Sequence, residues 1–107
     1  MIPGILKIKA QTIYGLTKKG KRMYLFKPTQ SESTKYIVAT KVNPNNYRRN
    51  LYVLITPSSA TFVSTQKYPR GNLVKILGEV GQLDVEIEHR RYVRFQHQID
   101  QIGRAHV

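Results

Sequence analysis

Short runs of alternating apolar and polar residues, separated by turn-forming residues, recur along most of the chain. The first run covers residues 4–10, where the apolar Leu6, Ile8 and Ala10 alternate with positions that include lysines. A period of two with one basic face predicts a half-buried β-strand. We therefore expect Leu6, Ile8 and Ala10 to face the core of a sheet.

More strands are predicted from runs that are rich in β-branched and aromatic residues. These runs cover residues 23–27, 35–42, 50–55 and 72–77, and residues 60–64 form either a short extension or an irregular segment. Turn-forming residues separate them: a lysine-flanked glycine predicts a tight hairpin at residues 17–21, residues 29–34 form a polar loop, and residues 43–46 and 68–71 form turns.

The pattern is ambiguous at two places. In the second run Tyr24 and Phe26 share one face and Leu25 lies on the other, and we expect Leu25 inside and Tyr24 outside. In residues 82–94, apolar residues spaced four apart with acids between them favour a short helix, whereas β-branched residues keep a strand open.

Short strands with few helix signals predict an all-β fold, and a five-stranded OB-fold barrel with a short C-terminal helix or extension matches best. The pattern does not separate an OB barrel from an SH3-like barrel, and it does not provide a strand order. We expect the OB domain in residues 1–94 and a C-terminal tail in residues 95–107.

The excess of positive charge in the sequence indicates that this β domain binds a polyanion. The chain of 107 residues has 18 Lys and Arg against 6 Asp and Glu, a formal net charge of +12, and Glu32 is the only acid in residues 1–78. Such asymmetry is typical of nucleic-acid binders, with an anionic membrane as the second choice. The chain has no cysteine, no signal peptide and no apolar run of the ~18 residues that a membrane span needs, so an intracellular protein is expected.

Basic and tyrosine side chains are interleaved along the chain. Single-stranded nucleic acid is bound by cations that contact phosphates and by aromatic rings on which bases stack. In an OB barrel the outer face of the middle strands and the loops at one rim form such a groove. The candidates are Lys7, Lys9, Tyr14, Lys18, Lys19, Lys21, Arg22, Tyr24, Lys27, Lys35, Tyr36, Arg48, Arg49 and Arg70. For any single tyrosine the alternative is packing within the domain, and for Arg48 and Arg49 it is a solvated loop.

Patterns for catalysis and metal binding are lacking. His89, His97 and His106 have no metal-ligand spacing, and His89, between two charged residues, is expected at the surface. No serine lies in a nucleophile-elbow context, and there is no glycine-rich phosphate loop. We therefore expect no catalytic site, no metal and no cofactor in this chain, and no small-molecule substrate.

Residues 68–81 carry a specific arrangement, Tyr68-Pro69-x-Gly71-x-x-Val74-x-x-Leu77-Gly78-x-x-Gly81. It resembles the end of the second cold-shock-like OB domain in the ribonuclease II/R (RNB) family of exoribonucleases, in its exosome-type and large-DNA-virus branch. Leu25, Phe26 and Pro28 and the run at residues 51–55 are similar to the same domain. The resemblance covers residues 4–94 and implies a module that guides single-stranded RNA to a 3′-to-5′ exoribonuclease.

The family's catalytic domain uses clustered aspartates to hold Mg²⁺. Asp84 and Asp100 are the only aspartates here, so Mg²⁺ is expected only in a catalytic domain that this chain lacks. Residues 102–107 resemble the translation of a sequencing adapter, which favours a fragment of a longer protein; the alternative is a disordered native tail.

These observations predict binding of single-stranded RNA without sequence preference, in the N-terminal guiding module of such an exoribonuclease. One alternative is a free-standing protein that binds single-stranded nucleic acid. Another is a basic scaffold protein that contacts structured RNA or an acidic partner. Preference for RNA over DNA rests on 2′-hydroxyl contacts, which no motif here reveals.

Overall fold

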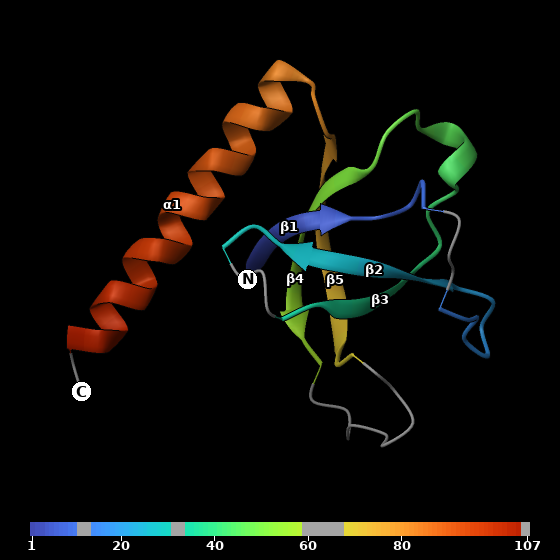
Figure 1. The fold of residues 1–107 in the computed structure, drawn as a ribbon, viewed down its shortest axis with the longest axis horizontal. Coiled ribbons are helices and arrows are strands. Elements are labelled where there is room, and N and C mark those ends of the chain that lie inside the picture. The colour runs from blue at the N-terminus through green and yellow to red at the C-terminus, as the bar shows by residue number, and fades with distance from the viewer. Residues whose placement is uncertain (11–13, 31–33, 59–67, 106–107) are drawn as a thin grey trace.

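The computed structural model describes residues 1–10, 14–30, 34–58 and 68–105, with the backbone alone for residues 96–105. Its elements are β1 (Ile2–Leu6), β2 (Arg22–Pro28), β3 (Tyr36–Thr40), the 3₁₀ turn η1 (Pro44–Asn46), β4 (Leu51–Pro57), β5 (Arg70–Glu79) and α1 (Leu83–Ala105). The strands form a barrel, and α1 lies along one side of it and extends beyond it (Figure 1).

The strands close into a barrel in the order β1-β2-β3-β5-β4, with β4 paired back onto β1. All pairs are antiparallel except β3 with β5, which run parallel with Ile37 opposite Arg70. A closed barrel of five strands with this crossover is an OB-type barrel. The predicted all-β OB fold is confirmed, and the order that the sequence pattern did not provide is now defined.

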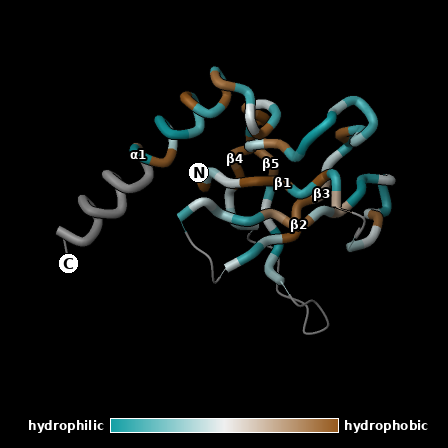
Figure 2. The backbone as a smooth tube through the Cα atoms, turned by 45° about the horizontal axis from the view of Figure 1, so that its top comes forward, coloured by the Kyte–Doolittle hydropathy of each residue, from teal (hydrophilic) through white to brown (hydrophobic). Residues whose placement is uncertain are grey.

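Side chains from β1 to β4 and from Ile8 fill the interior of the barrel, and Leu73 and Ile76 of β5 pack against them half-buried. The core cluster contains Leu6, Ile8, Tyr24, Phe26, Val38, Leu51, Val53 and Ile55, and Figure 2 shows hydrophobic residues concentrated on these strands. The expected facing of β2 is wrong: Tyr24 and Phe26 are buried and Leu25 points outward, half-buried. Both faces of this strand are apolar, so the choice depends on its register with Val38, which the pattern alone does not contain.

The first strand differs from its predicted extent. It ends at Leu6, because the Ile8 backbone N–H donates to the Leu6 carbonyl at 2.9 Å and turns the chain there. Ile8 is still buried, but Ala10, which was expected in the core, is exposed. The predicted alternation of buried and more exposed positions therefore continues past the strand to Ile8 and ends before Ala10.

The other strands lie where they were predicted, with shifted ends. β5 is longer than expected and has register shifts opposite Val53 and Ile55, which bend it around the barrel. The predicted turns at Gly20 and at residues 43–46 are present as a hairpin and as η1. The segment at residues 60–64 lies outside the described residues.

The ambiguous C-terminal segment is helical, and the helix is longer than predicted. α1 begins at Leu83 and continues through the expected tail to Ala105. Among residues 83–95, Val85 and His89, one turn apart, are the buried residues of the helix. Within the part of the chain that the structure describes, no helix is long and apolar enough to cross a membrane.

Candidate nucleic-acid interface

The hairpin between β1 and β2 is a tight turn in which Lys18 and Lys19 are exposed and Lys21 is half-buried. Thr17 donates its backbone N–H to the Lys21 carbonyl at 2.9 Å, and the Gly20 N–H donates to the Thr17 carbonyl at 2.9 Å. The Thr17 hydroxyl accepts the Lys21 N–H at 3.1 Å, and Gly20 has a φ of +80°, which glycine adopts without strain. The turn is thus held by its own backbone, and its lysine side chains are free to project.

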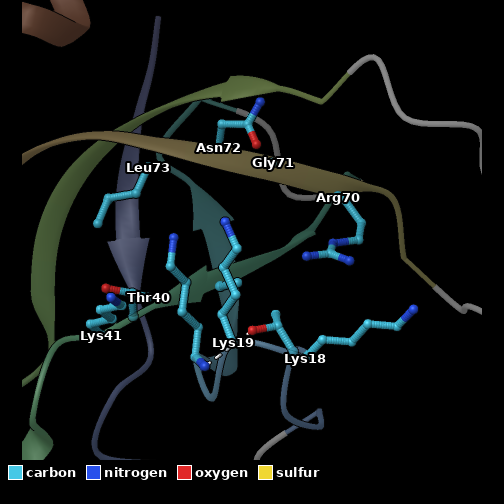
Figure 3. A pocket seen from close by; sticks show the side chains of 11 residues that line it. Lys18, Lys19, Thr40, Lys41, Arg70, Gly71, Asn72 and Leu73 are labelled. Carbon is cyan, nitrogen blue, oxygen red and sulfur yellow. Dashed lines mark hydrogen bonds between the residues drawn. The ribbon is translucent and has the colours of Figure 1, made fainter.

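This hairpin forms one wall of a cleft of about 690 Å³. The end of β3 and the start of β5 form the other walls, and Figure 3 shows residues 70–73 of β5 lying across from the hairpin lysines. The lining residues are Thr17, Lys18, Lys19, Lys21, Ala39, Thr40, Lys41, Arg70, Gly71, Asn72 and Leu73. Gly71 leaves room for the core at this point, because a Cβ there would lie 2.8 Å from Ile55 Cδ1 and would force that side chain to shift.

The cleft is strongly cationic. Five of its lining residues are Lys or Arg and none is acidic. Among the described residues, the ion pair is Lys75 with Glu88 at 3.5 Å, on β5 and α1 and outside the cleft. The cleft cations therefore have no carboxylate partner in the described part of the chain, and an anion with several charges would be attracted to them.

The structure brings four of the predicted site residues together in this cleft: Lys18, Lys19, Lys21 and Arg70. It also adds Lys41 and Asn72, which sequence reasoning did not select. Lys41 directly follows β3 and lines the cleft there. Its position at the end of a predicted strand was the feature of the sequence that could have identified it as a candidate site residue.

Other predicted cations lie elsewhere on the barrel. Lys9 Nζ donates to the Pro44 carbonyl at 3.0 Å, the Arg48 N–H donates to Glu79 Oε1 at 2.8 Å, and the Arg49 guanidinium lies against Gly81. Four further candidates also do not line the cleft: Lys7 and Lys35 are half-buried, and Arg22 and Lys27 are exposed.

The tyrosines differ in what they can offer to a base. Tyr24 is 1% exposed in the core, so its predicted role in stacking on nucleic acid is wrong. Tyr36 is half-buried and tilted against Phe26, with ring centroids 6.3 Å apart. Tyr14 is 39% exposed and meets Tyr68 edge to face at 6.1 Å.

Tyr14 also lies next to the cleft. Its N–H donates to the Met23 carbonyl at 2.8 Å, and Met23 is paired with Ala39, a lining residue. Tyr68 stands two residues before Arg70 on the opposite wall. Tyr14 is thus the predicted tyrosine that combines an exposed ring with a position beside the cations.

A second polar cluster lies where α1 meets β4. The His89 ring stacks on the Tyr52 ring at 3.9 Å, and His89 Nε2 is hydrogen-bonded to Thr29 Oγ1 at 2.7 Å. The Tyr52 hydroxyl donates to the Glu86 carboxylate at 3.1 Å, which also accepts the Gly81 N–H at 3.1 Å. The expectation that His89 is a surface residue is wrong, because helical spacing places it with Val85 against the barrel.

Burial perturbs both rings of this junction. Desolvation lowers the pKa of His89, opposed by Glu86 and reinforced by Arg90. Desolvation also raises the pKa of the Tyr52 hydroxyl, together with its hydrogen bond to Glu86. Since each polar group has a partner, this junction holds the helix in place. Within the described residues, no group of His, Cys, Asp or Glu could hold a metal ion.

Comparison with protein families matches residues 23–89, more than half of the chain, to the Dis3-like cold-shock domain 2 (CSD2), an OB domain. The match covers β2 to β5 and the first turns of α1. No curated protein and no solved structure shows significant similarity to the chain.

Proposed function

The chain belongs to the Dis3-like cold-shock domain 2 family, an RNA-binding OB module of RNB exoribonucleases, and from this premise we propose that its cationic cleft binds single-stranded RNA. The supporting observation is the convergence of five Lys and Arg side chains from three separate segments, with no acidic residue among them. Phosphates spaced along a strand match such an arrangement better than one small anion does.

Binding in the cleft is electrostatic and independent of base sequence. Lysine acts as a point charge that follows a phosphate, and Arg70 offers a planar fork that can hold one phosphate by two hydrogen bonds. Tyr14, supported edge-on by Tyr68, provides a ring on which one base stacks. Every base has a π-face, so this contact also tolerates any sequence.

The domain serves as the substrate-guiding module of a 3′-to-5′ exoribonuclease. It holds the strand, and hydrolysis with Mg²⁺ takes place in a catalytic domain elsewhere in the parent protein. An OB module of this kind contributes to affinity and to the path of the strand, and it contributes no reacting group.

Fluorescence anisotropy of a labelled oligouridylate, titrated with the chain across a salt series, tests the proposal. Lys18→Glu/Lys19→Glu/Lys21→Glu should weaken binding by about 100-fold and flatten the salt dependence, because about three phosphate contacts become repulsive. Binding that hardly changes with salt would contradict the proposal.

A matched pair of single reversals separates the cleft from general charge. Lys41→Glu lies in the cleft and Arg48→Glu lies outside it, and both change the net charge equally. We expect about a fivefold loss for the first and less than twofold for the second. Equal losses would place binding outside the cleft, and tight binding to duplex RNA alone would favour a scaffold that contacts structured RNA.

A further inference from the structure

A second pair of cations lies on the other side of the barrel, and neither has a carboxylate within ion-pair distance among the described residues. Arg90 and Arg94 are exposed on α1 and line a groove of about 340 Å³ between this helix and the end of β2, together with Thr29. Figure 1 shows the hairpin of the cleft on the side of the barrel away from α1. The groove is therefore separate from the cleft.

The walls of this groove are fixed by hydrogen bonds. Gln30 Nε2 donates to the Val93 carbonyl at 3.0 Å, and Thr29 Oγ1 is bonded to His89 Nε2 at 2.7 Å. These contacts tie the residues after β2 to the helix on the same turns that carry the two arginines. The groove is thus built before a ligand arrives, which reduces the entropy cost of binding.

The charges of the groove favour an anion. Arg90 and Arg94 are one helical turn apart, so they repel each other when nothing lies between them. Glu86 is the acid that lines the groove, and its carboxylate already accepts hydrogen bonds from the Tyr52 hydroxyl and the Gly81 N–H. The two guanidinium forks offer the donors that a phosphate accepts.

Strand β2 links the groove to the cleft. It begins at Arg22, next to the hairpin, and ends at Pro28, next to Thr29, so its seven residues span about 20 Å. Lys27 is exposed near the groove end, and the half-buried Lys35 directly precedes β3, whose first residue pairs with Phe26. Cations therefore stand at both ends of this face of the barrel.

We propose that the groove is a second phosphate-binding site for the same single strand, which runs from the cleft along the outer side of β2 to Arg90 and Arg94. This inference rests on the proposed function of the cleft. The inference predicts that an RNA strand long enough to span both sites binds more tightly than a short one, because binding of one half in the cleft raises the effective concentration of the other half at the groove.

The test compares a short labelled oligouridylate of about 4 nucleotides with a long one of about 12, the range of site sizes for OB folds. Arg90→Ala/Arg94→Ala should weaken binding of the long strand by about tenfold and lower its salt slope by about 1.4, and leave the short strand unchanged. The control Arg91→Ala/Arg48→Ala removes the same charge away from the groove and should change either strand by less than about twofold. Thermal unfolding verifies that both variants are folded.

The outcomes separate this inference from the proposed function. If both strands bind and Arg90→Ala/Arg94→Ala weakens the long strand no more than the short one, the inferred RNA site in the groove is wrong and the proposed function of the cleft stands. The two arginines would then be available to an acidic protein partner. An equal loss in the control also overturns the groove, because long-range charge would then explain the effect. Failure of the unchanged chain to bind either strand at low salt overturns the cleft and the groove together.

Discussion

The cleft and the helix junction are both polar, and they differ in whether their polar groups have partners. At the junction, Tyr52, Glu86 and His89 bond to one another or to neighbouring backbone and hydroxyl groups. In the cleft, cations from three segments face a common space without an acid among its lining residues. The polar groups of the junction are hydrogen-bonded within the protein, whereas the cations that line the cleft have no acidic partner among its lining residues.

This difference has a physical consequence for stability. Buried polar groups that are hydrogen-bonded to one another stabilise a fold, and removal of one partner destabilises it because the other is left buried without a hydrogen bond. Like charges gathered at a surface repel each other and do not favour folding, which is why we propose an external anion as their partner. Substitutions at the junction should therefore change unfolding, and substitutions in the cleft should change binding.

The largest effect on stability is expected at Gly78, where β5 passes beneath α1. Gly78 has a φ of +142°, and a Cβ there would lie 2.5 Å from Cγ2 of the buried Val85. Gly78→Ala should lower the free energy of unfolding by about 3 kcal/mol, from backbone strain and from displacement of the helix. Urea unfolding measures this loss, and binding of a short oligonucleotide below the transition should be unchanged.

Gly20→Ala is the matched control for this substitution. Gly20 also has a positive φ, +80°, but a Cβ there would meet nothing within 4 Å. Its cost should be about 1 kcal/mol, from the backbone alone. An equal loss at both glycines would contradict the packing of α1 against Gly78.

A smaller effect on stability is expected when the hydroxyl groups of two buried tyrosines are removed, and its sign should differ between them. Tyr52→Phe removes the hydroxyl that donates to Glu86 and should cost about 1 kcal/mol. Tyr24→Phe removes a hydroxyl that is buried without a hydrogen-bond partner among the described residues, and should leave stability unchanged or raise it by about 1 kcal/mol. Denaturant midpoints of the two variants check the sign, and a comparable loss in Tyr24→Phe would show that its hydroxyl is bonded.

The barrel was predictable because its signals are local. Runs of β-branched residues mark the strands, and Gly20 and the Asn-Pro turn mark breaks between them, so the number and order of the strands along the chain depend little on the rest of the fold, whereas their exact ends do. The facing of β2 was not predictable, because Tyr24 and Leu25 are both apolar enough for the core. That choice depends on which strands lie opposite, and therefore on the closed barrel.

The candidate site was predictable in part for the same reason. The hairpin lysines are adjacent in sequence, so their clustering is local. Lys41 joins them through the antiparallel pairing of Arg22 with Thr40, and Asn72 joins them through the parallel pairing of β3 with β5. His89 was misplaced because its sequence neighbours are charged. Its spacing of four from Val85 was the better guide, since residues that far apart share one face of a helix.

The smallest effect we expect is a pH dependence that belongs to the junction and not to the cleft. Burial holds the pKa of His89 below its usual value of 6.5, so the unfolded chain takes up a proton more readily than the folded one. His89 therefore favours the folded state fully above pH 6.5, and this contribution is lost as the pH falls through its lowered pKa. His89→Phe keeps a ring to stack on Tyr52 and cannot titrate, so unfolding of this variant should change less between neutral pH and the onset of carboxylate protonation. Equal pH dependence of the variant and the unchanged chain would show that His89 is not the group that titrates at the junction.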